Sequence, residues 1–117
     1  MGNFKELNVW NRSKALAVEI YRISMEGKLA KDFGLRDQMR NSAVSVPSNI
    51  AEGDELDTQK QAIRHFYIAK GSLAELRTQL EISYEIAYLS EELFLKLDNE
   101  CDEIGKMISA LIKHRRK

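Results

Sequence analysis

Side chains that could do chemistry are present in this chain, but few stand at the spacings that a reaction needs. His65 and His114 are the only histidines, and they lie too far apart in sequence to suggest a ligand cluster. Cys101 falls on an apolar helical stripe, so we expect a small core residue rather than a nucleophile. No nucleophile elbow, phosphate-binding loop, zinc-protease motif, Cys-x-x-Cys pair or calcium loop occurs. The sequence therefore predicts a non-enzyme with no catalytic residue, no metal site, no cofactor and no small-molecule substrate.

An acidic run is the one cluster that could hold a metal: Glu52, Asp54, Glu55 and Asp57. Carboxylates at this spacing could converge on a hard divalent cation. A structural explanation is favoured, because acids are stabilising just before the N-terminus of the helix that follows. Glu52 is a separate case, since it stands one turn after Ser48 and Asn49. These three residues predict a structural polar network, with a ligand or RNA contact as the alternative.

Basic residues repeat at helical spacing and are the candidates for phosphate contacts. The chain has 18 basic and 18 acidic residues, so a nucleic-acid surface must come from local clustering. If the basic groups gathered on one side of an assembly, they would bind phosphates with salt-sensitive affinity. A solvated polar face is the favoured explanation for each pair, and phosphate contact is the alternative. The candidate nucleic-acid contacts are Arg36, Arg40, Lys60, Arg64, Lys113, Arg115, Arg116 and Lys117.

These candidates must be positioned by helices, and residues 34–53 carry the clearest helical pattern. Apolar residues recur there every three or four positions, the spacing of one helix face: Leu35, Met39, Ala43 (or Ser42), Val46 and Ile50. Pro47 has no N–H for the carbonyl of Ala43, so the helix should kink or end there. We favour a kinked, continuing helix, because the apolar spacing survives beyond Pro47 to Ile50.

Three more helices are predicted, over residues 9–24, 58–89 and 90–111, with residues 27–34 mostly as a connection. Asn8, Thr58 and Ser90 are the expected N-caps of these helices, and Asp32 is a candidate cap for the proline-containing helix. Four helices with short connections predict one all-α domain over residues 1–117. The expected fold is an antiparallel up-and-down four-helix bundle with a proline-kinked second helix.

The third predicted helix carries a second stripe made mostly of small residues: Tyr67, Gly71, Ala74 and Thr78. Glycine inside a helix costs about 1 kcal/mol relative to alanine, so it is easiest to explain where another backbone comes close. Tight packing within the bundle is the favoured explanation, and a contact with another subunit is the alternative. A second apolar side on the first and third helices favours self-association, because a simple bundle buries only one face of each helix. These four residues are the candidate oligomer contacts.

Two segments, GLRDQMRNSAVSVPSNIAEG (34–53) and IAKGSLAEL (68–76), together with Trp10 before an early helix, resemble the 23S rRNA intervening-sequence proteins. The likeness covers nearly the whole chain. The resemblance implies a small four-helix bundle that forms ring-like homo-oligomers, pentamers among them. It also implies RNA or DNA as a candidate partner, because the family is associated with inserted elements in ribosomal RNA genes. A similar bundle serves as accessory protein to the reverse transcriptase of diversity-generating retroelements. Family members often have two adjacent arginines where this chain has Arg40-Asn41. The missing arginine weakens the implication that this chain binds RNA or DNA.

The composition of the chain bears on its expected location in the cell. One cysteine cannot form an intrachain disulfide, and no run of about 20 apolar residues could span a bilayer, so we expect a cytoplasmic protein without a membrane partner. The predicted function is a non-enzymatic helical bundle that self-assembles into a homo-oligomeric scaffold of undefined cellular role. The alternative is a nucleic-acid-binding accessory protein that uses basic patches on the oligomer.

Overall fold

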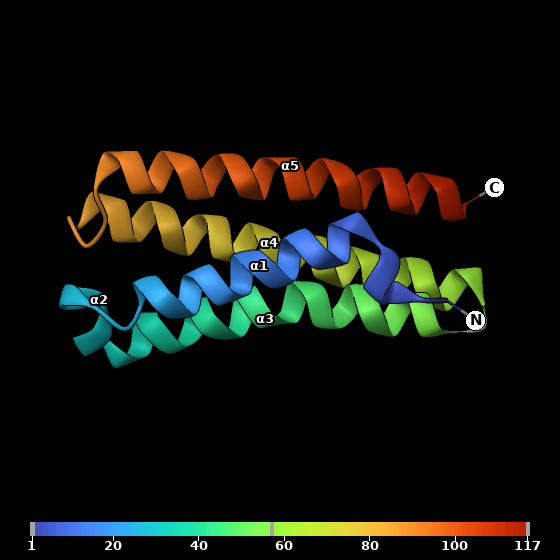
Figure 1. The fold of residues 1–117 in the computed structure, drawn as a ribbon, viewed down its shortest axis with the longest axis horizontal. Coiled ribbons are helices and arrows are strands. Elements are labelled where there is room, and N and C mark those ends of the chain that lie inside the picture. Colours follow the sequence, from blue (N-terminus) through green and yellow to red (C-terminus); the bar gives the residue numbers. More distant parts are fainter. Residues whose placement is uncertain (1, 57, 117) are drawn as a thin grey trace.

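A computed structural model describes residues 2–56 and 58–116, which form helices joined by short turns (Figure 1). The elements are a 3-10 turn at Phe4–Glu6, α1 (Asn8–Ile23), α2 (Gly27–Lys31), α3 (Phe33–Glu55), α4 (Gln59–Glu85) and α5 (Glu91–Arg115). No strand occurs among these residues, so the all-α prediction is confirmed. Four of the helices are long.

Three of the long helices begin at the caps that the sequence predicts. The side-chain oxygens of Asp32, Thr58 and Ser90 each accept a hydrogen bond of 3.2 Å from the backbone N–H three residues further on. Such a bond satisfies one of the free donors at the start of a helix. The prediction for Asn8 was wrong, because the 3-10 turn leads directly into α1 and Leu7 takes the cap position without a side-chain bond.

The predicted connection at residues 27–34 contains a further short helix, α2. Gly27 begins α2 with a φ of 63°, a backbone conformation that glycine adopts without strain. The carbonyl of Ala30 in α2 accepts a hydrogen bond of 3.2 Å from Nη1 of Arg36 in α3. The sequence pattern could not predict this bond, because it joins two different helices.

The helix α3 runs from Phe33 to Glu55 without interruption through Pro47, so the prediction of a continuing helix is confirmed. Pro47 is buried, and the nearby polar side chains bond locally. Nδ2 of Asn49 donates to the carbonyl of Ser45 at 2.9 Å and to its hydroxyl at 3.0 Å. Side chains one turn apart thus supply polar contacts around the proline.

The long helices lie side by side along the 44 Å length of the molecule (Figure 1). Helix α1 packs against α3 and α5, and α4 packs against the same two helices, so α1 and α4 occupy opposite corners. Contacts between α3 and α4 join the middle of one to the middle of the other, as in Ser45 Oγ to Ser72 Oγ at 2.7 Å. The largest fully buried side chains include Ile20, Met39, Ile50, Phe66, Leu76, Leu80, Ile104 and Ile108. Burial of each contributes about 1.5–3 kcal/mol.

The helices α3 and α4 are in close contact at Gly53. A Cβ atom at this position would lie 2.7 Å from the ring of Phe66 and 3.0 Å from the carbonyl oxygen of Ala62. No side chain fits in that space without movement of backbone or ring. Gly53 therefore sets how closely the end of α3 approaches the start of α4.

Candidate nucleic-acid and self-association surfaces

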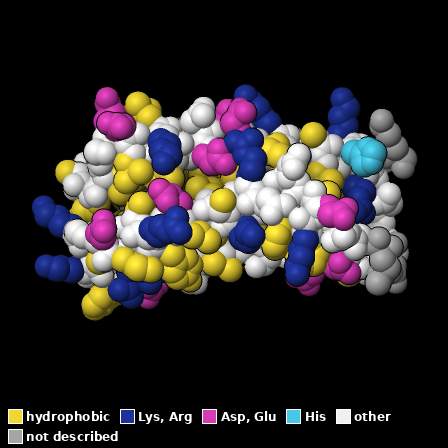
Figure 2. Space-filling model, viewed as in Figure 1, with side chains coloured by type: hydrophobic (Ala, Val, Ile, Leu, Met, Phe, Trp, Pro, Cys, Tyr) yellow, Lys and Arg dark blue, Asp and Glu magenta, His cyan; other side chains and the backbone are white. Residues whose placement is uncertain are grey.

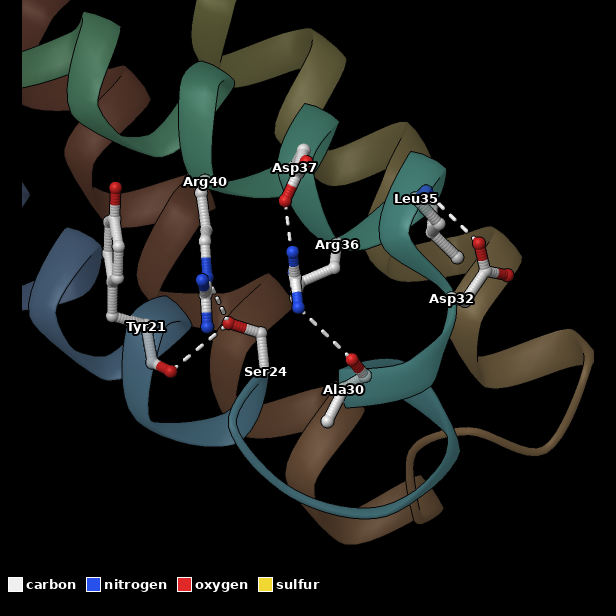
Figure 3. Close-up of polar contacts among 8 residues, drawn as sticks. All are labelled: Tyr21, Ser24, Ala30, Asp32, Leu35, Arg36, Asp37 and Arg40. Atoms are coloured by element: carbon white, nitrogen blue, oxygen red, sulfur yellow. Dashed lines mark hydrogen bonds and ion pairs between the residues drawn. The ribbon is translucent and has the colours of Figure 1, made fainter.

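Arg36 and Arg40 both point from α3 toward the corner where α1 ends and α2 begins (Figure 3). Nε of Arg40 donates to the hydroxyl of Ser24 at 2.8 Å, and its guanidinium stacks 4.7 Å from the ring centre of Tyr21. Nε of Arg36 donates to Asp37 at 2.9 Å while its Nη1 holds α2. These two candidates for phosphate binding are thus engaged by their own chain.

The other described basic candidates lie at the opposite end of the bundle. Among them, Arg115 is engaged within the chain. Its Nη2 lies 2.7 Å from Oδ1 of Asp54, and its Nη1 donates to Gln59 at 3.1 Å. Asp54 is only 6% exposed, so this ion pair ties the end of α5 to the turn between α3 and α4. The structure gives this member of the acidic run a structural partner.

The rest of the acidic run does not gather around Asp54. Glu52 and Glu55 are exposed, and Asp57 lies outside the described residues. No cluster of three or more potential metal ligands occurs in residues 2–56 and 58–116. The second carboxylate oxygen of Asp54 has no hydrogen-bond partner there, and Gly2 of the N-terminal arm lies against it.

Lys60, Arg64, Lys113 and Arg116 are exposed at the same end as Arg115. The guanidinium of Arg116 lies 5.7 Å from the ring centre of Tyr67 and donates to its hydroxyl. Lys117 lies outside the described residues. The structure therefore separates the basic candidates into two groups, with Arg36 and Arg40 at one end of the bundle and the others at the opposite end.

Charge is divided sharply along α4 and α5. Residues 59–72 and 104–116 contain seven Lys and Arg residues and no Asp or Glu. Residues 73–103 contain nine acidic and two basic residues. The two basic segments lie side by side, because Tyr67 of α4 contacts Arg116 of α5. We call residues 59–72 with 104–116 the basic half, and residues 73–103 the acidic half.

Ion pairs neutralise part of the acidic half. Nε of Arg77 lies 3.0 Å from Asp98, and its Nη1 lies 3.6 Å from Asp102. The hydrogen bond to Asp98 raises the pKa of the Arg77 guanidinium. Lys106, at the border of the basic half, lies 3.2 Å from Asp102, which raises the pKa of this ammonium group. Ion pairs this open to solvent add little to stability, because water and salt screen them.

A groove of about 420 Å³ runs between α4 and α5 where the two halves meet. Its floor is made of small or apolar residues, which include Ala74, Cys101 and Gly105. Cys101 is fully buried, and burial raises the pKa of its thiol to about 12. The prediction of a core residue at this position is confirmed, and the thiol is a poor nucleophile.

The predicted polar network of Ser48, Asn49 and Glu52 takes a different form. Oδ1 of Asn49 lies 3.0 Å from Nδ1 of His65 in α4, and Oε2 of Glu52 lies 3.8 Å from the same nitrogen. Ser48 is exposed and has no side-chain hydrogen bond among the described residues. Ser45 and His65, which the sequence interpretation left out, join Asn49 instead. The i, i+4 spacing within α3 could have identified Ser45, whereas only the pairing of α3 with α4 could have identified His65.

All four residues of the small-residue stripe on α4, Tyr67, Gly71, Ala74 and Thr78, are exposed. Nothing lies within 4 Å of the position that a Cβ atom of Gly71 would take. Packing within the bundle therefore does not explain this glycine. Tyr67 and Ala74 border the space between α4 and α5.

Exposed apolar side chains concentrate on two helices. Of the ten large hydrophobic residues that are exposed in the described parts of the chain, seven lie on or directly after α1 and α4. We define the α1 face as Val18, Tyr21 and Met25, and the α4 face as Ile68, Gly71, Thr78, Ile82 and Ile86. Figure 2, which views the molecule from the α1 side, shows hydrophobic side chains gathered over α1 and α3.

Comparison with known proteins identifies the family. The family model described as 23S rRNA-intervening sequence protein matches residues 5–110. The chain belongs to the 23S rRNA-intervening sequence protein family. The predicted resemblance is thereby confirmed. No curated protein matches the chain.

A solved structure extends the family's fold to this chain. The crystal structure of a protein with unknown function from the S23 ribosomal protein family of Bacteroides thetaiotaomicron VPI-5482 has a TM-score of 0.84 to it. The two share 25% sequence identity, over 90% of this chain and 95% of that one. Like that protein, this 23S rRNA-intervening sequence family member is helical, and neither description names a catalytic activity. No helix in the described residues has both the length and the hydropathy to cross a membrane.

Proposed function

We propose that this chain is a non-enzymatic, antiparallel up-and-down four-helix bundle, kinked at Pro47, that self-assembles into a homo-oligomeric scaffold. The observation that carries the proposal is the pair of exposed apolar faces at opposite corners of the bundle. The α1 face of one copy packs on the α4 face of the next. Such a head-to-tail contact generates a ring when its rotation closes, and a pentamer is the ring that the family resemblance implies.

The shapes of the two faces support this pairing. The α4 face has bulky isoleucines toward both ends, and between them the small residues Gly71 and Thr78 flank the exposed Glu75. The surface above Gly71 is open, and the proposed contact places Tyr21 of the α1 face there. Large exposed apolar patches on soluble proteins mark interaction sites, and burial of Val18 and Ile82 would each contribute about 1–2 kcal/mol.

A cross-linking experiment tests the head-to-tail geometry. A chain that carries both Val18→Cys and Thr78→Cys, treated with a flexible bis-maleimide, is expected to give a ladder that ends at the number of copies in the ring. Chains with either cysteine alone are expected to stay uncross-linked, because neither face meets itself. Efficient cross-linking of a single variant into dimers would contradict the head-to-tail contact.

A second function, nucleic-acid binding, is favoured by one specific observation. The basic half contains seven cations and no acidic residue, although the whole chain has zero formal net charge. Only Arg115 among these cations has a buried acidic partner. A ring in which all copies run in the same direction would place every basic half at one rim, where phosphates could bind.

Salt-dependent binding tests this second function. Binding of fluorescein-labelled RNA, measured by anisotropy, is expected to weaken steeply between 50 and 200 mM salt (a range of about 10³-fold or more if six phosphates are contacted). The variant Lys113→Ala/Arg116→Ala is expected to bind more weakly, whereas Lys96→Ala, in the acidic half, is the matched control. Absence of binding at low salt would rule out this function.

A further inference from the structure

The basic half contains a cleft that neither the family description nor the preceding proposals explain. It has a volume of about 330 Å³ and lies between the start of α4 and the end of α5. Its lining combines three cations with a hydroxyl, an aromatic ring and an aliphatic side chain: Lys70, Lys113, Arg116, Ser109, Tyr67 and Ile112. No acidic side chain lines it.

Tyr67 gives this cleft a property that a simple basic patch lacks. The side chain is 46% exposed, so a large part of its ring is open to solvent. The guanidinium of Arg116, itself exposed, now covers the ring at 5.7 Å and binds the hydroxyl. A guanidinium that rests on an exposed ring can move aside, or it can bind a phosphate while another flat group stacks on the tyrosine.

The cations on either side of the tyrosine come from both helices. Lys70 stands three residues after Tyr67 on α4, while Lys113 lies in the last turn of α5 and Arg116 directly follows that helix. None of these cations has an ion-pair partner within 4.0 Å in the described residues: Lys70, Lys113 and Arg116. Their charges are therefore available to an anion from outside the chain.

We propose that this cleft binds a nucleotide of a single-stranded nucleic acid, with its base on the ring of Tyr67 and its phosphate among Lys70, Lys113 and Arg116. The proposal rests on the second proposed function, nucleic-acid binding, and specifies which form of nucleic acid is bound. Bases in a duplex are stacked on one another and present no free face, whereas bases in a single strand do. A cationic groove with an aromatic platform is the usual means of binding single strands without sequence preference.

The preference for single-stranded over duplex nucleic acid is tested with two probes of equal charge. A fluorescein-labelled single-stranded oligo(U) and a duplex RNA with the same number of phosphates are titrated by anisotropy at 50 mM salt. We expect tighter binding of the single strand. Tyr67→Ala is expected to weaken single-strand binding about tenfold and to leave duplex binding unchanged, whereas Tyr67→Phe keeps the ring and the affinity. Lys113→Ala/Arg116→Ala should weaken both, and reduce the salt slope by about two.

A second readout does not depend on the stability of any variant. In the unmodified protein, an oligonucleotide with 4-thiouridine is expected to photo-cross-link to the peptide that contains Tyr67, as mapped by mass spectrometry. Competition for the oligonucleotide by uridine monophosphate or by inorganic phosphate distinguishes nucleotide binding from simple anion binding. We expect inorganic phosphate at equal ionic strength to compete poorly.

The outcomes separate the two proposals. Equal affinity for both probes, with no effect of Tyr67→Ala and no cross-link at Tyr67, would overturn the cleft but leave nucleic-acid binding in place. Displacement by inorganic phosphate as effective as by the nucleotide would also overturn it, in favour of a plain anion site. No binding of either probe at low salt would overturn both proposals.

Discussion

The two sides of α4 have opposite environments. Toward α3, Gly53 lies so close to Phe66 and Ala62 that no Cβ atom fits, and polar pairs such as Ser45 with Ser72 bridge the helices. On the outer side, Gly71 faces open space. The seam between α3 and α4 is therefore complete within one chain, whereas the α4 face is not. A small-residue stripe alone does not distinguish a packed seam from an open face.

The strongest test of the closed end of the bundle is the ion pair between Asp54 at the end of α3 and Arg115 at the end of α5. Replacement of Asp54 by Ala would leave Arg115, whose side chain is 20% exposed, without its carboxylate, so we expect a loss of about 3 kcal/mol of unfolding free energy. Urea unfolding followed by circular dichroism measures the loss. Glu55→Ala, at an exposed neighbouring site, should change stability by less than about 0.5 kcal/mol. Equal effects of the two changes would show that the ion pair does not stabilise this end of the bundle.

Gly53→Ala tests the close approach itself. The added methyl group would overlap the ring of Phe66 and the backbone of α4, so we expect a loss of about 2 kcal/mol. The same unfolding experiment applies. An unchanged free energy of unfolding would mean that α3 and α4 can separate slightly without loss of stability. The seam would then not depend on glycine at this position.

Gly71→Ala is the matched opposite of that change. In a chain made monomeric by Ile82→Glu, we expect a gain of about 1 kcal/mol, because the new Cβ meets nothing and alanine favours the helix. In the assembled protein, the gain should shrink or reverse, because the α1 face of the next copy occupies the space. An identical gain in both backgrounds would place Gly71 outside the subunit contact.

The groove floor at Cys101 gives the smallest and simplest effect. Because burial raises the pKa of its thiol to about 12, only about one molecule in ten thousand carries the thiolate at pH 8. Reaction with Ellman's reagent should therefore be very slow in the native protein and fast in 6 M guanidinium. A fast native reaction would show that the groove opens to its floor.

Local signals in the sequence predicted much of the fold, and tertiary contacts account for the differences. Caps at Asp32, Thr58 and Ser90 depend on residues three positions apart, so they could be predicted. The role of Arg115 could not, because its partner Asp54 is 61 residues away. For the same reason the sequence could not predict that His65 contacts Asn49. It also could not show that Arg36 and Arg40 lie at the opposite end of the bundle from the basic half.

The two glycines show the same limit for the candidate sites. The helical pattern placed Gly71 on a stripe of small residues, but it could not show whether a second helix of the same chain covers that stripe. The division of charge between residues 59–72 with 104–116 and residues 73–103 was readable in the sequence. Its meaning emerged only when the pairing of α4 with α5 brought the two basic segments together.

The most direct test of self-association through the α1 and α4 faces is the molar mass in solution, measured by light scattering on a sizing column. The unmodified protein is expected to run several-fold above its 13.5 kDa, and Val18→Glu and Ile82→Glu are each expected to reduce the mass to that of one chain. Leu95→Glu, at a more exposed apolar residue on α5, is expected to leave the assembly intact. A single-chain mass for the unmodified protein, or equal effects of all three changes, would contradict the account.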